Sequence, residues 1–352
     1  QEGIVLLQNK EDLLPIDKDR TKKILVVGEN AVKTLCDGGG SSTLKVKYEV
    51  SPLQGIRTWA GRQVEVNYVA GYASSKGANA LQLRMEAAQA AEQADIVLFV
   101  GGLNKNWNQD AEGADGQTFD LPYQQNELID ELAKVNSNVV VDLIPRTAAA
   151  MPWAQQVNAI GLSWAKGTEA GNALASVLFG EVNPSGKLPF TFPVKLEDNS
   201  AHSIGEFPGD GKKVAYKEGI FVGYRWADKE KIKPLFAFGH GLSYTTFQYG
   251  KIMADKKEVT ETDRITFTVS VKNTGGKAGA EIVQLYINDI NSRLPRPVKE
   301  LKGFKKVYLQ PEEEQVVSFT IGKEELSYYD DEKHEWVVEP GEFRALIGAS
   351  SA

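Results

Sequence analysis

Short apolar runs alternate with segments of helical periodicity through the first half of the chain. The segments at helical spacing are Leu81–Ala94, Tyr123–Val135 and Glu169–Phe179. The apolar runs predict buried strands at Ile24–Gly28, Val64–Val69, Ile96–Gly102, Val139–Leu143 and Ala159–Ser163. Strands that alternate with helices of this length predict a largely parallel sheet with helices on both faces, and we assign this α/β sandwich domain to residues 1–200.

Strict alternation of apolar and polar residues replaces this pattern towards the end of the chain. Arg264–Lys272 alternates throughout, and the turn residues Asn273–Gly276 follow it. Further apolar runs predict strands at Glu281–Ile287, Val316–Ile321 and Gly341–Gly348. Residues 250–352 are therefore expected to form an antiparallel β-sandwich of immunoglobulin or fibronectin type III kind, so that the fold class is α/β plus all-β. Residues 201–249 are rich in turn residues and predict a linker packed on its neighbours.

The composition excludes several function classes. With 352 residues and a formal net charge of −7, the chain is long enough for two domains and is poorly suited to nucleic acid or an anionic membrane. No run approaches the roughly 20 apolar residues that a membrane span needs. The single cysteine, Cys36, excludes an intrachain disulfide and any CxxC site. We expect no metal site, because the histidines show no ligand spacing: His202, His240 and His334.

An acidic loop, which includes residues 110–120, follows the predicted strand Ile96–Gly102. Open α/β sheets bind ligands beyond the carboxyl ends of their strands, so Glu112 is well placed there for proton transfer. The same loop carries alternative acids, of which Asp120 suits an N-terminal cap for the next helix; the others are Asp110 and Asp115. Gly38–Ser42 invites a phosphate-loop interpretation, but it lacks the GK[ST] ending and the GxGxxG spacing, which favours a backbone turn instead.

Longer motifs run through the whole chain in a fixed order. They are Gly3–Ile16, Gly38–Ser42, Ser51–Ile56, Leu121–Pro122 with Gln125, Met151–Trp153, Val182–Pro193, Tyr216–Arg225, Phe236–Tyr244 and Val298–Phe304. Together they resemble the C-terminal two-thirds of glycoside hydrolase family 3, the β-glucosidase family. The opening segment is similar to the one that leaves the family's N-terminal barrel. Because Gln1–Leu7 also lacks the features of a signal peptide, we expect the chain to be part of a longer polypeptide.

The resemblance implies a retaining glycosidase that needs no cofactor. In this family the nucleophile is an Asp on the barrel domain, and the acid/base is often a Glu on a loop that reads Glu-Gly-x-Asp-Arg. Glu112–Asp115 fits the first four positions, so the resemblance makes Glu112 the acid/base, and Asp115 and Trp107 the substrate-binding candidates. Trp107 could equally pack against a neighbouring domain. Retaining hydrolysis requires two carboxyl groups about 5–5.5 Å apart, so the isolated chain, without the nucleophile, is expected to be inactive.

Two departures from the family pattern fall near the expected sugar crevice. Gly116 stands where the family usually has Arg, and Pro145–Arg146 stands where relatives tend to have a small Ser-Gly turn. Both departures favour reduced activity without changing the fold. Lys166–Gly171, with Trp164, is expected to form a strand-to-helix turn beside the crevice. Tyr224 and Arg225 are expected to lock the linker onto the other domains.

The expected partners are an oligosaccharide or glucoside substrate and a barrel domain on the same or a separate polypeptide. A homodimer formed through the β-sandwich is a further alternative. The alternative function is a catalytically inactive sugar-binding or structural fragment of such an enzyme. Because polysaccharide-degrading members are commonly exported, a periplasmic or secreted location is expected by analogy, with the cytoplasm as the alternative.

Overall fold

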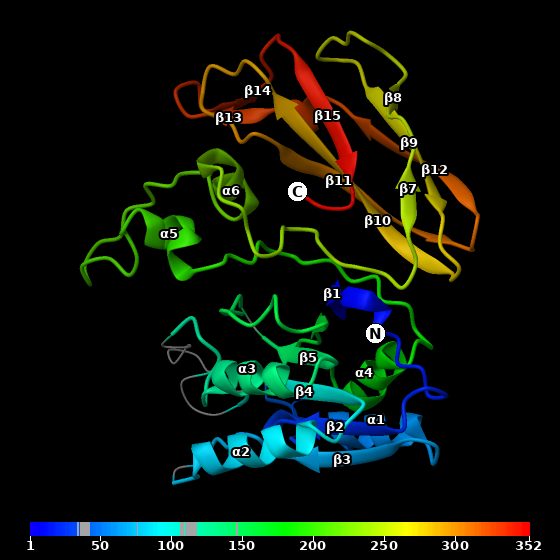
Figure 1. Ribbon diagram of the computed structural model, residues 1–352. Helices are drawn as coiled ribbons and strands as arrows, with labels where there is room; N and C mark the ends of the chain where they lie inside the picture. The colour runs from blue at the N-terminus through cyan, green and yellow to red at the C-terminus, as the bar shows by residue number, and fades with distance from the viewer. Residues whose placement is uncertain (34, 36–42, 76, 106–108, 110–117, 146) are drawn as a thin grey trace. The chain divides into compact units, whose positions relative to one another are not determined.

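The structure is a computed structural model that describes residues 1–33, 35, 43–75, 77–105, 109, 118–145 and 147–352 (Figure 1). The chain divides into two compact units. The first comprises residues 1–187 and 241–244, and the second comprises residues 188–240 and 245–352. The sequence-based domain limits at residues 200 and 249 stay a prediction, because a compact unit and a domain are defined differently.

The first unit is built on a six-stranded sheet in the order β1-β6-β5-β4-β2-β3. Neighbouring strands are parallel except for the edge pair β1 and β6, which is antiparallel. The predicted parallel α/β fold is therefore confirmed, whereas β1 was not predicted. The strands are β1 (Val5–Asn9), β2 (Lys23–Val27), β3 (Glu65–Val69), β4 (Ile96–Gly102), β5 (Val139–Ile144) and β6 (Ala159–Leu162).

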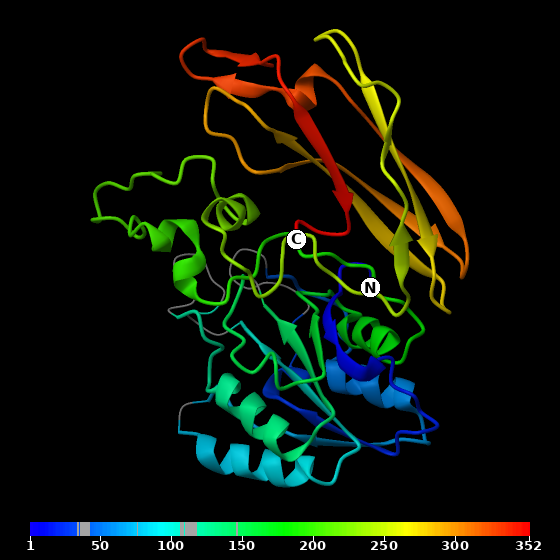
Figure 2. The ribbon, with the colours of Figure 1, turned by 45° about the horizontal axis from the view of Figure 1, so that its top comes forward.

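Helices cover both faces of this sheet. Figure 2 shows α2 (Ala80–Ala91) beside α3 (Gln125–Val135), and α1 (Pro52–Ala60) beside α4 (Ala170–Leu178). Successive side chains along a strand point to opposite faces of the sheet, so each strand can pack against a layer of helices on both sides. The face under α1 and α4 buries a cluster that includes Ile24, Val26, Leu98, Val140, Ile56 and Leu174. The unit also contains the short 3-10 helices η1 (Lys10–Asp12) and η2 (Glu29–Ala31).

Helices α1 and α4 approach each other through glycine. A methyl group at Gly55 would lie 2.2 Å from the carbonyl of Gly171, and one at Gly171 would lie 2.0 Å from the Ser51 carbonyl oxygen. Ser51 also caps α1, since its side chain accepts a hydrogen bond from the Gln54 N–H, and Pro52 occupies the first turn. The backbones of the two helices can therefore pack closely only because neither glycine carries a side chain.

The second unit is an antiparallel β-sandwich with short helices. One sheet has the order β11-β10-β15, and the other has the order β12-β9-β7 with β8 also paired to β9. The strands are β7 (Phe247–Tyr249), β8 (Met253–Ala254), β9 (Ile265–Asn273), β10 (Gly279–Asp289), β11 (Glu300–Leu309), β12 (Glu314–Ile321) and β15 (Phe343–Gly348). A hairpin of β13 (Tyr328–Asp330) and β14 (Glu335–Val337) and the helix α7 (Lys323–Leu326) lie between β12 and β15. The predicted antiparallel sandwich is confirmed.

Residues 188–240 carry the helices η4 (Leu196–Asp198), α5 (Ser200–Ser203) and α6 (Tyr224–Glu230). The hydroxyl of Tyr224 accepts a hydrogen bond from the Leu301 N–H at 2.9 Å, and Arg225 lies 3.4 Å from Glu300. Both contacts join α6 to β11. The predicted structural role of Tyr224 and Arg225 is therefore confirmed for their attachment to the β-sandwich. Among the helices that the structure describes, none has the length and apolar character of a membrane span.

Candidate functional site

The sheet order places a topological switch point between β2 and β4. From β2 the chain crosses through α1 to β3 on one side, and from β4 it crosses through α3 to β5 on the other. Ligands bind open α/β sheets in the crevice that opens at such a point beyond the carboxyl ends of the strands. The residues that leave these ends are Glu29 and Asn30 after β2, and Leu103 and Asn104 after β4.

A buried glutamine fixes the end of β4. The Gln125 side chain accepts a hydrogen bond from the Gly102 N–H at 2.7 Å and donates one to the Gly102 carbonyl at 3.0 Å. Gln125 is fully buried at the start of α3, and Gly102 has a φ of 101°, which favours glycine. The next residue, Leu103, donates its N–H to the Ile144 carbonyl at 3.0 Å. The acidic loop thus leaves the sheet from a rigidly held position.

Asn30 joins the ends of β2 and β4. Its side-chain amide donates to the Leu103 carbonyl at 3.0 Å, and its backbone N–H donates to the hydroxyl of Tyr72 at 3.2 Å. Burial raises the pKa of Tyr72, so the phenol stays neutral. The ring of Tyr72 also stacks on Tyr123, with the ring centres 6.2 Å apart. These contacts hold the ends of β2 and β4 together.

The acidic loop returns to the same edge of the sheet. The Phe119 carbonyl accepts a hydrogen bond from the Ala150 N–H at 2.8 Å, and Leu121 is buried. The prediction that Asp120 caps the next helix is wrong. Helix α3 begins at Gln125, too far from Asp120 for a cap, and its N-cap, Gln124, makes no side-chain cap. Asp120 instead accepts a hydrogen bond from the side chain of Asn126 at 3.2 Å.

Glu29 lies just after the end of β2, and its surroundings favour the charged form of its carboxylate. Burial opposes ionisation, but hydrogen bonds from Ser74 and the ion pair with Lys33, at 3.1 Å, outweigh it and lower the pKa of Glu29. Ser74 donates both its N–H and its hydroxyl to Glu29, at 2.7 and 3.1 Å. A carboxylate held in this way is a poor proton donor near neutral pH, because a general acid needs a raised pKa. Glu29 is therefore a structural anchor of η2.

A buried ion pair joins β5 to the segment that follows β6. The Lys166 ammonium is 3.5 Å from a carboxylate oxygen of Asp142, with side chains only 5% and 2% exposed. The Ser163 hydroxyl donates to the same carboxylate. Desolvation raises the pKa of Asp142 and lowers that of Lys166. Sequence reasoning missed this pair, although a lone Asp inside the apolar run Val139–Leu143 was a signal.

The pair holds the turn between β6 and α4. This turn carries Trp164, whose φ of 55° lies in the left-handed region and whose indole N–H donates to the Gly3 carbonyl at 2.9 Å. The predicted strand-to-helix turn at Trp164 and Lys166–Gly171 is confirmed, since β6 ends at Leu162 and α4 begins at Ala170.

The residues predicted to act on substrate lie outside the described residues. These are Trp107, Glu112 and Asp115, and with them Asp110, Gly116, Arg146 and the turn Gly38–Ser42. Pro145 is described and is buried directly after β5. Within the described ranges, no three His, Cys, Asp or Glu side chains gather as metal ligands.

Comparisons with known proteins agree with this architecture. Residues 4–224 match the glycosyl hydrolase family 3 C-terminal domain, and residues 281–351 match the fibronectin type III-like domain. A β-glucosidase of Bacteroides ovatus is 49% identical to this chain, covering 100% of the chain and 49% of the relative. The thermostable β-glucosidase B of Acetivibrio thermocellus is 44% identical, covering 99% of the chain and 46% of the relative.

Solved structures show the same likeness. A β-glucosidase of Kluyveromyces marxianus superposes with a TM-score of 0.91 at 30% identity, covering 99% of this chain and 58% of that one. A family 3 β-glucosidase of Bifidobacterium adolescentis gives a TM-score of 0.90 at 36% identity, covering 99% of this chain and 50% of that one. The fold thus defines an α/β sandwich domain followed by a fibronectin type III-like domain. The chain belongs to glycosyl hydrolase family 3, as part of its C-terminal region, and spans about half the length of the curated relatives it matches.

Proposed function

We propose that this chain carries the general acid/base of a retaining, exo-acting β-glucosidase that removes terminal non-reducing β-D-glucosyl residues. Glu112 protonates the glycosidic oxygen while an Asp on a barrel domain attacks the sugar carbon, and Glu112 then deprotonates the incoming water. The relatives named as β-glucosidases support the substrate class. The barrel domain, on the same or a separate polypeptide, is part of the proposal.

The observation that carries this proposal is the anchoring of the acidic loop. Gln125 holds the strand end before the loop, and Ala150 holds Phe119 after it. Both ends therefore lie at the carboxyl edge of the sheet, where a loop carboxylate can reach a ligand in the switch-point crevice. Trp107 and Asp115 share this loop and are proposed to contact the substrate, Trp107 by stacking on a sugar face.

Chemical rescue in the complete enzyme tests the role of Glu112. We expect Glu112→Ala to slow glucosides with poor leaving groups by about 10²–10⁴-fold, because such leaving groups need protonation. Activated aryl glucosides should be much less affected in their first step. Azide should restore turnover by attacking the glycosyl-enzyme, and the glycosyl azide should retain the β configuration.

The matched controls are Asp110→Ala and Asp115→Ala on the same loop. Neither should give a leaving-group-dependent loss together with azide rescue. Normal hydrolysis of both substrate types by Glu112→Ala would refute the assignment. The acid that then showed rescue, Asp110 or Asp115, would take the role.

A further inference from the structure

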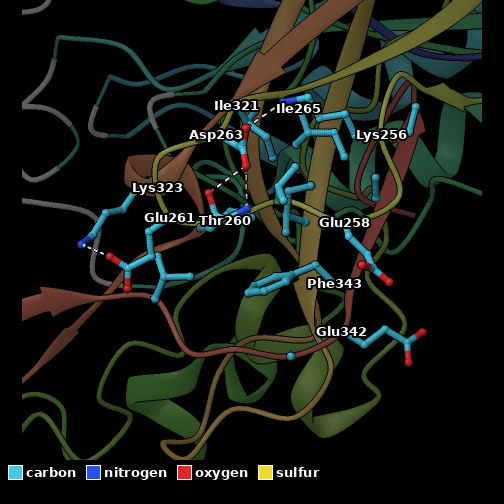
Figure 3. A pocket seen from close by; sticks show the side chains of 18 of the residues that line it. Lys256, Glu258, Thr260, Glu261, Asp263, Ile265, Ile321, Lys323, Glu342 and Phe343 are labelled. Carbon is cyan, nitrogen blue, oxygen red and sulfur yellow. Dashed lines mark hydrogen bonds and ion pairs between the residues drawn. The ribbon is translucent and has the colours of Figure 1, made fainter.

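A cavity of about 730 Å³ lies inside the β-sandwich, lined by apolar residues of β9 and β15 (Figure 3). Several polar side chains that line it already have partners within the chain. The N–H and hydroxyl of Thr260 donate to Asp263, and Lys323 pairs with Glu261 at 2.8 Å. Because these groups are satisfied, the cavity indicates no particular ligand. The exposed apolar side chains of the same unit are more informative.

The segment between α5 and α6 exposes large apolar side chains to solvent (Figure 1). Every residue from 207 to 217 is exposed. Five large apolar side chains in residues 207–222, which we call the apolar loop, are about half exposed or more: Phe207 (58%), Val214 (50%), Tyr216 (78%), Ile220 (49%) and Val222 (51%). Exposed apolar clusters with polar neighbours mark interaction surfaces.

The apolar loop has a defined conformation. The Asp210 carboxylate accepts a hydrogen bond from the Lys213 N–H at 2.7 Å, and Gly209, with a φ of 81°, lies so close that a methyl group there would be 2.5 Å from the Lys213 carbonyl oxygen. Glu206, just before the loop, forms an ion pair with Lys217. These contacts use polar and backbone groups, so they leave the apolar side chains available to a partner.

The charge of this segment favours a protein as the partner. Residues 206–222 carry three basic and three acidic side chains, which balance. A segment without net positive charge has no electrostatic attraction to an anionic membrane or to nucleic acid. An apolar face of another protein domain is therefore the partner that fits the apolar loop.

The relatives contain a domain that can supply this face. The chain covers 49% of the β-glucosidase of Bacteroides ovatus and 46% of that of Acetivibrio thermocellus, so about half of each relative lies outside the matched region. Two parts of one polypeptide meet at a high effective concentration. The other half of the enzyme is therefore the partner that the apolar loop meets most often.

We propose that the apolar loop is a surface on which this other half, the barrel domain of the proposed function, docks. Phe207, Tyr216 and Ile220 pack on apolar side chains of the barrel domain and lose their exposure. The proposal rests on the proposed function for the existence of the barrel domain. It depends on no catalytic residue, so the docking can fail while Glu112 keeps its role.

Hydroxyl-radical footprinting read by mass spectrometry tests the docking. It compares the 352-residue chain with the complete enzyme, which includes the barrel domain. We expect the oxidation of Tyr216 to be about fivefold slower in the complete enzyme, because the core of a protein interface excludes water. The control residue is Tyr308, which is 62% exposed on β11 and should be oxidised at the same rate in both samples.

A pair of substitutions gives a second readout. Tyr216→Ser combined with Ile220→Ser should leave the thermal unfolding of the 352-residue chain unchanged, because both side chains are exposed there. The same pair should lower the Tm of the complete enzyme by about 2–4 °C. The matched control is Tyr308→Ser combined with Val316→Ser, also at exposed positions, which should have the same effect in both samples.

The outcomes separate the possible occupants. Equal oxidation of Tyr216 in the two samples would overturn the proposal. So would slow oxidation in the 352-residue chain alone: a dependence on chain concentration would make the occupant a second copy, and no such dependence would mean that the chain itself covers the loop. Glu112→Ala should leave the protection of Tyr216 unchanged. Azide rescue of that variant without protection of Tyr216 would refute the docking and leave the proposed function standing.

Discussion

Gln125 shows how one side chain determines where the acidic loop begins. We expect Gln125→Ala to lower the free energy of unfolding by about 2–4 kcal/mol, because it leaves the buried N–H and C=O of Gly102 without partners. Urea unfolding followed by circular dichroism measures the change. The matched control is Gln82→Ala on the exposed face of α2, which should change stability by less than about 0.5 kcal/mol. Equal effects of the two changes would contradict this role of Gln125.

The buried pair of Asp142 and Lys166 should behave as a unit. Lys166→Met alone leaves an unpaired buried carboxylate and is expected to cost about 3–5 kcal/mol, whereas Asp142→Leu combined with Lys166→Met should be nearly neutral or stabilising. A double-mutant cycle in urea measures the coupling. Additive losses from the two single changes would show that the pair does not act together.

The pair of Asp142 and Lys166 should also make the stability of the protein depend on pH. Burial raises the pKa of Asp142 above its unfolded value, so its contribution to stability is present at low pH and is lost as the pH rises through the folded pKa. The cost of Lys166→Met should therefore be smaller at about pH 5 than at about pH 8. A cost independent of pH would mean that Asp142 does not titrate in the variant.

The sequence predicted only part of the site at the level of single residues. The chemical nature of the acidic loop followed from its residues, because carboxylates after a buried strand are visible in the sequence. The residues that hold the loop in place could not be predicted from the sequence. Gln125 appeared only within a family motif, and its two bonds to Gly102 depend on how α3 packs on β4. The pairing of Asp142 with Lys166 depends on adjacent strands that are separated by a crossover, which periodicity cannot reveal.

At the scale of elements, the contact between α1 and α4 depends on the absence of side chains. Replacing a helical Gly by Ala normally stabilises a helix by about 1 kcal/mol. We expect the opposite for Gly55→Ala, a loss of about 1–3 kcal/mol, because the added methyl would collide with the Gly171 carbonyl. Thermal unfolding measures this loss of stability. Gly3→Ala is the control, since nothing lies within 4 Å of the added methyl. A stabilised Gly55→Ala variant would refute the close packing.

Sequence patterns predicted those elements that carry a clear physical signal. Buried parallel strands are continuous apolar runs, and the strands at the centre of the first sheet were all predicted at nearly their observed positions. Strands β1 and β11, which were not predicted, lack such a signal. Strand β1 is an antiparallel edge strand that ends in polar residues, and β11 carries lysines and a glycine in its middle. Their pairing is decided by neighbours far along the chain, not by their own periodicity.

At the scale of the whole molecule, the proposed mechanism requires a second carboxylate from outside this chain. We expect no hydrolysis of an aryl β-glucoside by the chain alone, and hydrolysis when it is mixed with a separately produced barrel domain, because the retaining mechanism needs both carboxyl groups about 5–5.5 Å apart. Intact mass, 38.6 kDa for this chain, verifies each sample. A mixture made with Glu112→Ala should lose activity on poor leaving groups. Turnover by the pure chain would mean that both carboxylates lie within it, and the proposed division of the active site would then be wrong.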